Sequence, residues 1–243
     1  VVLKFEFNTE EGAWTNVTVI AGTGSQGKGS DDIVGTESAL NYPRSLSLIE
    51  SSNGAVTAIL IADMNNHRIR KLDMSTRIIT TIAGTGVSGD VGDGGLAKDA
   101  QLSQPRHVYF DKSTGDIFIV DTNNHRIRRV SGGTISTVVG KACSFDDGLR
   151  DGGQAVDACL NNPYYFTMND AREWFIDDYG NNRIRKVDLH GTITTVAGGG
   201  TETGDSLATQ VKLNNPEGIA FTSSGELLVT DISGSVIRKV DKS

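Results

Sequence analysis

Apolar and polar residues alternate along this chain in short runs, without the longer period of an amphipathic helix. Four successive runs between residues 107 and 139, HVYF, IFIV, RIRRV and ISTVV, are rich in β-branched and aromatic residues, which favour strands. The segments between them, DKSTGD, DTNNH and SGGT, hold Gly, Asn and Asp, which tolerate the positive φ of tight hairpin turns. The pattern predicts an antiparallel four-stranded meander, with helix nearly absent.

This meander recurs along the chain. Four apolar runs end in an aspartate, at intervals of 58, 57 and 53 residues: Asp63, Asp121, Asp178 and Asp231. The four prolines keep the same spacing, at Pro43, Pro105, Pro163 and Pro216. Repeats of this length indicate stacked structural units, and a ring of such sheets protects their edge strands. We therefore predict an all-β fold, a single β-propeller domain over residues 1–243. Its units span approximately 23–83, 84–139, 140–197 and 198–243.

A polar turn follows each aspartate. It reads MNNHRIRK at 64–71, TNNHRIRR at 122–129 and YGNNRIRK at 179–186. The aspartate and the first arginine, such as Asp121 and Arg126, are expected to face each other across a hairpin, where opposite charges can pair. Because charged residues recur at every equivalent position, we expect them to stabilise the repeat itself. We therefore interpret the motif as structural, with a binding role as the alternative.

A proline, a strand and then Asp-x-Asn-Asn-His-Arg-Ile-Arg resembles the NHL repeat. The match is close in the first three units, whereas TDISGSVIRKVD at 230–241 keeps Asp231, Ile237 and Arg238 without Asn-Asn-His. The segments at 92–105 and 151–163 resemble the long inter-blade loop of NHL proteins. This resemblance implies a β-propeller with four-stranded blades.

The number of blades has two interpretations. The last unit offers three strands, while residues 1–22 hold two spare ones, VVLKFEF and NVTVIAG, and the second of these matches the missing fourth strand. The two ends could thus meet in one blade and close a four-bladed ring. The alternative is that the chain is part of a six-bladed ring, the number that members of this family more often have.

The net charge and the apolar runs of the chain argue against two classes of function, nucleic-acid binding and membrane insertion. Thirty acidic against 23 basic residues give a net charge of −7, which argues against nucleic-acid binding. RNA binding, which some NHL domains perform through a basic face, is therefore not expected. The longest apolar run, at 55–62, is too short to span a bilayer, so no membrane insertion is expected.

Cys143 and Cys159 flank a glycine-rich loop, which a disulfide would close; two free thiols are the alternative. Asn16 begins a glycosylation sequon. Both features favour a secreted or extracellular, lumenal location.

The units differ from one another directly after each proline, where the innermost strand begins. These positions hold cations, aromatic rings and one carboxylate, a mixture that suits a small anionic group or an extended peptide. The alternative is that they only fill and hydrate the channel. The predicted ligand-binding residues are Arg44, Arg106, His107, Tyr164, Tyr165 and Glu217.

Catalytic and metal-binding patterns are sparse. The family that the repeat resembles has enzyme relatives, among them a lyase that holds its metal with several histidines of the central channel. This chain offers only His107 at such a position, and no catalytic residue is assigned. Calcium could be held near Asp93, Asp147 and Asp151, although the ligand spacing of an EF-hand is missing, and no cofactor is expected. We therefore predict a non-enzymatic scaffold for a protein, a peptide or a small ligand. The alternative is a metal-dependent lyase or hydrolase that uses His107, Tyr164, Tyr165 and Arg106.

Overall fold

The computed structural model describes residues 1–8, 12–141, 143 and 148–241. Their secondary structure consists of strands β1 to β18 and six single-turn 3-10 helices, η1 to η6, and these residues contain no α-helix. Hairpin turns rich in Gly, Asn and Asp separate the strands, as the sequence predicts. The chain divides into two compact units: unit 1 comprises residues 1–117 and 131–135, and unit 2 comprises residues 118–130 and 136–243.

Unit 1 contains a complete blade with one additional outer strand. Its sheet has the order β3-β7-β6-β5-β4, and its neighbouring strands are antiparallel. The strands are β3 (Ile33–Val34), β4 (Pro43–Glu50), β5 (Val56–Asp63), β6 (Arg68–Asp73) and β7 (Ile78–Ala83). Ile59, Ile61, Leu72 and Ile79 of this sheet form a core with Leu40 and the base of the β1–β2 hairpin.

The next four strands form a sheet with the order β11-β10-β9-β8, and its residues are divided between the two units. These strands are β8 (Pro105–Phe110), β9 (Ile117–Asp121), β10 (Arg126–Ser131) and β11 (Thr134–Val139). Within unit 1, β8 lies beside β4: the backbone N–H groups of Val108 and Phe110 donate to the hydroxyls of Ser45 and Ser47, at 3.2 and 2.9 Å. The first strands of successive blades are therefore neighbours, as expected for innermost strands.

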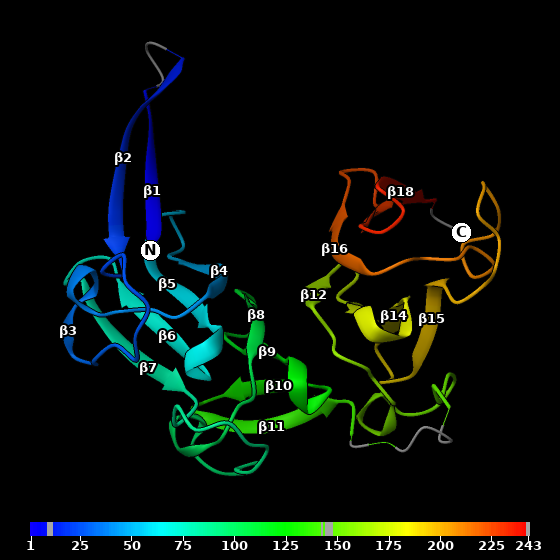
Figure 1. Cartoon of the computed structure of the whole chain (residues 1–243), viewed down its shortest axis with the longest axis horizontal. Helices are drawn as coiled ribbons and strands as arrows, with labels where there is room; N and C mark the ends of the chain where they lie inside the picture. The colour runs from blue at the N-terminus through cyan, green and yellow to red at the C-terminus, as the bar shows by residue number, and fades with distance from the viewer. Residues whose placement is uncertain (9–11, 142, 144–147, 242–243) are drawn as a thin grey trace. The chain divides into compact units, whose positions relative to one another are not determined.

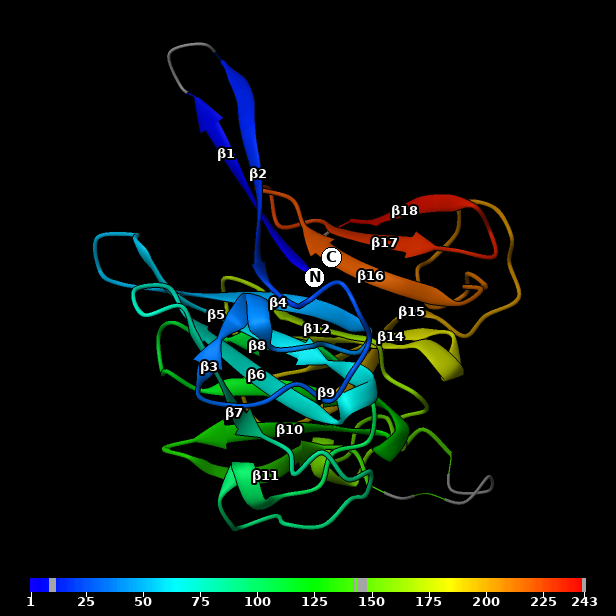
Figure 2. The ribbon, with the colours of Figure 1, turned by 60° about the vertical axis from the view of Figure 1, so that its left-hand side comes forward.

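Unit 2 contains two further blades. The first is the antiparallel sheet of β12 (Tyr165–Met168), β13 (Trp174–Asp178), β14 (Arg183–Val187) and β15 (Ile193–Gly198). The second has three strands, β16 (Pro216–Phe221), β17 (Leu227–Asp231) and β18 (Val236–Val240), which lie side by side in Figure 2. Phe175 and Ile184 of the first blade pack against Ile219, Leu227 and Val229 of the second. Blade faces thus bury each other, as a propeller requires.

The N-terminal strands form a separate two-stranded ribbon. β1 (Val2–Asn8) pairs antiparallel with β2 (Ala13–Ala21), and Figure 1 shows this hairpin projecting from the blade of β4 to β7. β18 is the edge strand of its three-stranded sheet. The expected spare strands and the three-stranded last unit are therefore both present, while closure of a four-bladed ring stays a prediction.

Candidate functional site

The repeated turn has one geometry in three blades. A buried aspartate ends the second strand, a 3-10 turn follows as η2 (Met64–Asn66), η4 (Thr122–Asn124) or η6 (Tyr179–Asn181), and the next residue is left-handed. That residue is His67, His125 or Asn182, with φ of 54°, 54° and 53°. Asparagine and histidine are among the residues that adopt this conformation most readily. The motif therefore encodes a sharp reversal between the second and third strands.

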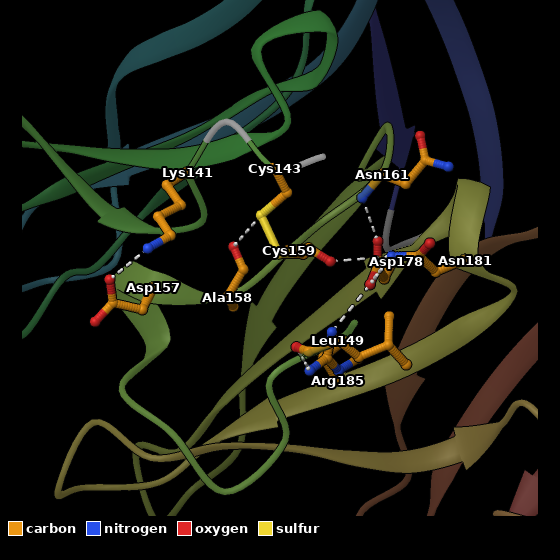
Figure 3. The surroundings of a disulfide bond; sticks show 10 residues. All are labelled: Lys141, Cys143, Leu149, Asp157, Ala158, Cys159, Asn161, Asp178, Asn181 and Arg185. Atoms are coloured by element: carbon orange, nitrogen blue, oxygen red, sulfur yellow. Dashed lines mark hydrogen bonds and ion pairs between the residues drawn. A yellow bond between two sulfur atoms is a disulfide. The ribbon is translucent and has the colours of Figure 1, made fainter. Parts of the chain in front are cut away.

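The aspartate of the motif organises this turn. In unit 2 the carboxylate of Asp178 accepts hydrogen bonds from the backbone N–H of Asn161 at 2.7 Å and from the side chain of Asn181 at 2.9 Å, as Figure 3 shows. Asp63 accepts the equivalent bonds from Asn41 and Asn66, at 2.7 and 2.8 Å. Burial raises the pKa of Asp178, and these bonds oppose that shift. The carboxylate is thus occupied by the blade itself.

The second arginine of Arg-Ile-Arg forms an ion pair with this aspartate: Arg128 Nη1 lies 3.9 Å from Asp121 Oδ2. The first arginine faces the aspartate across the hairpin in the equivalent pairs Asp63–Arg68 and Asp178–Arg183, as expected for Asp121 and Arg126. Arg185 links Asp178, at 3.2 Å, to Asp151 of the preceding loop, at 2.6 Å. The two arginines of Arg-Ile-Arg are two residues apart on one strand, so they share a face, and both can approach the aspartate.

These second arginines hold the inter-blade loops and are not surface groups. Arg70, Arg128 and Arg185 are each 0 % exposed, and Arg70 bonds the carbonyl of Ser30 and the carboxylate of Asp31, both at 2.8 Å. A repeated basic face made by these residues is therefore not available to a partner. The structural interpretation of the motif is confirmed for these contacts.

The left-handed residue of the motif links one blade to the next. His67 Nδ1 accepts a hydrogen bond from the backbone N–H of Gln104 at 3.1 Å, and His125 Nδ1 accepts one from Asn162 at 2.9 Å. In the following blade Asn182 Oδ1 accepts the same bond from Asn215, at 2.8 Å. Each donor directly precedes a repeat proline. The histidine of the motif is thus a connector between blades, a role that spacing in the sequence did not reveal.

The predicted disulfide is present. Cys143 and Cys159 are bonded, with their Cα atoms 5.6 Å apart. The carbonyl of Cys159 accepts a bond from Asn181 Nδ2 at 3.1 Å, so the disulfide is anchored next to the Asp178 network (Figure 3). Cys159 is therefore held both by the disulfide and by the repeated motif.

One predicted binding residue lines a pocket. A cavity of about 360 Å³ in unit 1 is lined by Arg44, Tyr42, Pro43, Leu40, Val1 and the glycine-rich segment 22–26. The Arg44 guanidinium lies over the Tyr42 ring, 5.6 Å from its centroid, and both side chains are exposed. Tyr42 and the segment 22–26 were not among the predicted residues. The left-handed Tyr42, with φ of 55°, directly precedes a repeat proline, and this place in the repeat is visible in the sequence.

The other two predicted residues of unit 1 lie on the neighbouring strand β8. Arg106 is half-buried, and His107 is buried, with 7 % of its surface exposed. Burial lowers the pKa of His107 to about 3. His107 is therefore a neutral ring near pH 7 and adds no positive charge to the pocket.

The remaining predicted residues lie in unit 2. Tyr164 stacks on Tyr179, with ring centroids 3.8 Å apart, and Tyr165 packs against the core of the last two blades, where burial raises its pKa. Glu217 is half-buried at the start of β16. The aromatic and acidic candidates thus belong to unit 2, and the basic candidates belong to unit 1.

The alternative enzyme site draws on both units, His107 and Arg106 from one and the two tyrosines from the other. Within the part of the chain that the structure describes, no group of three or more His, Cys, Asp or Glu side chains is placed to hold a metal. Of the calcium candidates, Asp151 pairs with Arg185, Asp93 occupies the corresponding loop position in the preceding repeat, and Asp147 lies outside the described residues.

Asn16, the candidate glycosylation site, is exposed on β2, and its Nδ2 donates to Glu6 at 3.2 Å.

Sheets with this strand order, joined through long loops and packed face to face, define blades of a β-propeller. Solved structures support this class: an auxiliary nutrient binding protein from Bacteroides ovatus superposes with a TM-score of 0.63 at 21 % identity, over 84 % of this chain and 49 % of that chain. None of the helices in the described residues is long and apolar enough to cross a membrane.

Residues 102–130 match the family model of the NHL repeat, which confirms the resemblance found in the sequence. The chain is 26 % identical over 231 residues to protein SUPPRESSOR OF QUENCHING 1, chloroplastic, of Arabidopsis thaliana, covering 90 % of this chain and 21 % of that protein. It is also 26 % identical over 258 residues to human NHL repeat-containing protein 2, covering 94 % and 35 %. The chain thus spans between about a fifth and about a third of these relatives.

Proposed function

We propose that this chain is a non-enzymatic binding scaffold that recognises an acidic peptide segment of a protein partner. The observation that carries the proposal is the pocket at the start of β4, in which the exposed Arg44 lies over Tyr42 beside a glycine-rich segment. The repeated residues are engaged in holding the blades together, so recognition is expected at positions that vary among the blades, and Arg44 is one of them.

The chemistry of the pocket favours a carboxylate. Arg44 has the only charged side chain among the described residues that line it, and a guanidinium binds a carboxylate through two parallel hydrogen bonds. The Tyr42 ring restrains this guanidinium by a cation–π contact. Ser25 adds a hydroxyl, whereas the Thr23 hydroxyl bonds within the segment to the Ser25 carbonyl at 3.3 Å. Gly24, with open space where a Cβ would stand, allows a ligand to approach the backbone closely.

A volume of about 360 Å³ suits one or two side chains of a peptide or a small organic acid. The Bacteroides ovatus neighbour is described as a nutrient binding protein, and this description is compatible with a propeller that binds a ligand without transforming it. The disulfide favours an oxidising compartment, and we propose a secreted or extracellular, lumenal location on that basis.

A peptide array tests the proposal. The purified chain is incubated with immobilised peptides that vary in Asp and Glu content, in parallel with Arg44→Gln and with Arg77→Gln, a matched control at an exposed arginine of the same unit. We expect binding that increases with acidic content, that falls about tenfold or more in Arg44→Gln, and that is unchanged in Arg77→Gln. Equal binding by all three proteins, or no preference for acidic peptides, would overturn the proposal.

A further inference from the structure

The turn that joins β4 to β5 holds the only asparagine of the chain that precedes a glycine, Asn53-Gly54. Residues 52–55 of this turn are exposed. Two backbone bonds close it: the N–H of Ser51 donates to the carbonyl of Ala55, and the N–H of Gly54 donates to the carbonyl of Ser51, both at 2.9 Å. A Cβ atom on Gly54 would meet open space, so nothing hinders an approach to this peptide unit.

The repeat forms the same turn without an asparagine at this position. In the third and last blades the turns at 169–173 and 222–226 are closed by the same two backbone bonds, at 2.9 to 3.1 Å. The residues that correspond to Asn53 there are Ala171 and Ser224. The amide group of Asn53 is therefore not a requirement of the repeat.

The side chain of Asn53 folds forward over the Gly54 peptide. Its Oδ1 accepts the backbone N–H of Ala55 at 3.1 Å, the bond of an Asx-turn. Because this bond spans Gly54, it holds the Asn53 Cγ atom on the side of the Gly54 nitrogen. The buried Asn66 is held differently, since its Nδ2 donates to the carboxylate of Asp63 at 2.8 Å.

Two donors converge on the amide oxygen of Asn53. The hydroxyl of Ser51 donates to Oδ1 at 2.6 Å, in addition to the Ala55 N–H; its contact with the Ala55 carbonyl is longer, at 3.0 Å. A nucleophile that attacks Cγ turns this carbonyl into a tetrahedral centre with negative charge on Oδ1. Donors already aimed at that oxygen stabilise the charge, so the turn carries a small oxyanion site around its own asparagine.

We propose that Asn53 is a site of spontaneous deamidation, promoted by the Ser51 hydroxyl. Hydroxide removes the proton from the Gly54 nitrogen, which attacks Asn53 Cγ and forms a five-membered succinimide. The Cγ–Nδ2 bond breaks, and Nδ2 leaves as ammonia after taking a proton from water, which regenerates hydroxide. A second water then opens the ring at either carbonyl, giving aspartate or isoaspartate. No atom is oxidised or reduced.

The bond from the Gly54 N–H to the Ser51 carbonyl opposes the first step, because the nucleophile is the deprotonated nitrogen. The turn is exposed, so this bond can exchange with water, and the rate should rise with pH as hydroxide becomes more abundant. The product places a carboxylate at the hairpin tip. Arg44 lies at the opposite end of β4, about 20 Å away at the rise of a strand, so the modification is independent of the proposed peptide site.

Peptide mapping tests the site. The purified chain is incubated at mildly alkaline pH, and its tryptic peptide 45–68 is sequenced by mass spectrometry at successive times. We expect the mass change from amide to acid at Asn53, in two products that separate by chromatography. Asn65 and Asn66 lie in the same peptide and serve as internal controls that should keep their amides.

The role of the hydroxyl is tested by three variants. Ser51→Ala should deamidate about fivefold more slowly, the factor expected from one hydrogen bond, whereas Ser51→Thr keeps a hydroxyl and should restore most of the rate. Ser52→Ala is the matched control, because Ser52 is the exposed neighbour in the same turn; its rate should equal that of the parent protein.

Three results would overturn the proposal. The first is loss of the amide at Asn65 or Asn66 in preference to Asn53. The second is a rate in Ser51→Ala that is unchanged or higher. The third concerns opening of the turn, followed by hydrogen exchange of the Gly54 N–H in the same proteins: slower deamidation that only parallels slower exchange would assign the effect to turn opening rather than to the hydroxyl.

Discussion

The histidine that connects two blades can be tested by replacing His125. Its Nδ1 accepts the backbone N–H of Asn162 at 2.9 Å, and Asn182 performs the same task in the next blade through its Oδ1. The chain thus already uses an asparagine in the position that His125 occupies in the preceding blade. His125→Asn should preserve the bond and the left-handed turn, whereas His125→Ala should remove the acceptor and leave the Asn162 N–H without its partner.

The expected magnitude follows from the bond and its surroundings. A hydrogen bond of this kind contributes about 1 kcal/mol, and a donor left without a partner in a partly buried site costs about as much again. His125→Ala should therefore lower the free energy of unfolding by about 1–2 kcal/mol, which corresponds to about 2–8 °C in Tm for a chain of this size. His125→Asn should stay within about 0.5 kcal/mol of the parent protein.

The pH dependence gives a second, independent signature. Burial lowers the pKa of His125, and the neighbouring Arg126 adds to this effect. Because the folded pKa lies below the unfolded value, this contribution to stability is complete above about pH 6.5 and is lost as the pH falls toward the folded pKa. The parent protein should therefore lose more stability than His125→Asn between pH 7 and pH 5.

Urea denaturation, monitored by tryptophan fluorescence at several pH values, measures both effects. The connector role would be refuted if His125→Asn destabilised the protein as much as His125→Ala does. It would also be refuted if the difference between the parent protein and His125→Asn did not change with pH.

Three further outcomes follow from described contacts. Cys143→Ser/Cys159→Ser should lower the free energy of unfolding by about 3 kcal/mol in urea denaturation, because the disulfide closes a loop with a sequence separation of 16; no change on reduction of the parent protein would contradict this. Arg185→Met should lower the free energy of unfolding by about 3–5 kcal/mol, since it leaves the buried carboxylate of Asp178 without its cationic partner, and a smaller loss than in Lys141→Met, which removes an exposed ion pair, would contradict it. Burial lowers the pKa of His107 to about 3, so its contribution to the free energy of unfolding is complete above about pH 6.5 and falls by about 2.7 kcal/mol by pH 4.5. In urea denaturation, the stability of His107→Gln should therefore fall by about that much less over this pH range.

The strands and their order could be predicted from the sequence because each strand is short, apolar and bounded by turn residues. The recurring aspartates and prolines also fixed the repeat, and the two cysteines on either side of one loop indicated the disulfide. These features depend on local chemistry and on spacing along the chain, which a sequence displays directly.

Side-chain direction accounts for what the sequence did not predict. Spacing placed Asp121 opposite Arg126, as the register of the equivalent Asp63 and Arg68 supports, but it did not show that Arg128 also pairs with Asp121, because a long side chain can reach past its nearest cross-strand neighbour. The connector role of His125 depends on a left-handed backbone that turns its ring toward the next blade. The Arg44 pocket depends on segment 22–26 folding back beside β4. Each of these requires three-dimensional contacts between distant parts of the chain.

The most direct test of ligand recognition at Arg44 is a titration of the isotopically labelled chain with a short peptide of alternating Asp and Gly, followed by amide NMR shifts. We expect saturable shifts at residues 22–26, Tyr42 and Arg44 that disappear in Arg44→Gln and persist in Arg77→Gln. Shifts confined to other residues, or the same shifts in Arg44→Gln, would contradict this expectation.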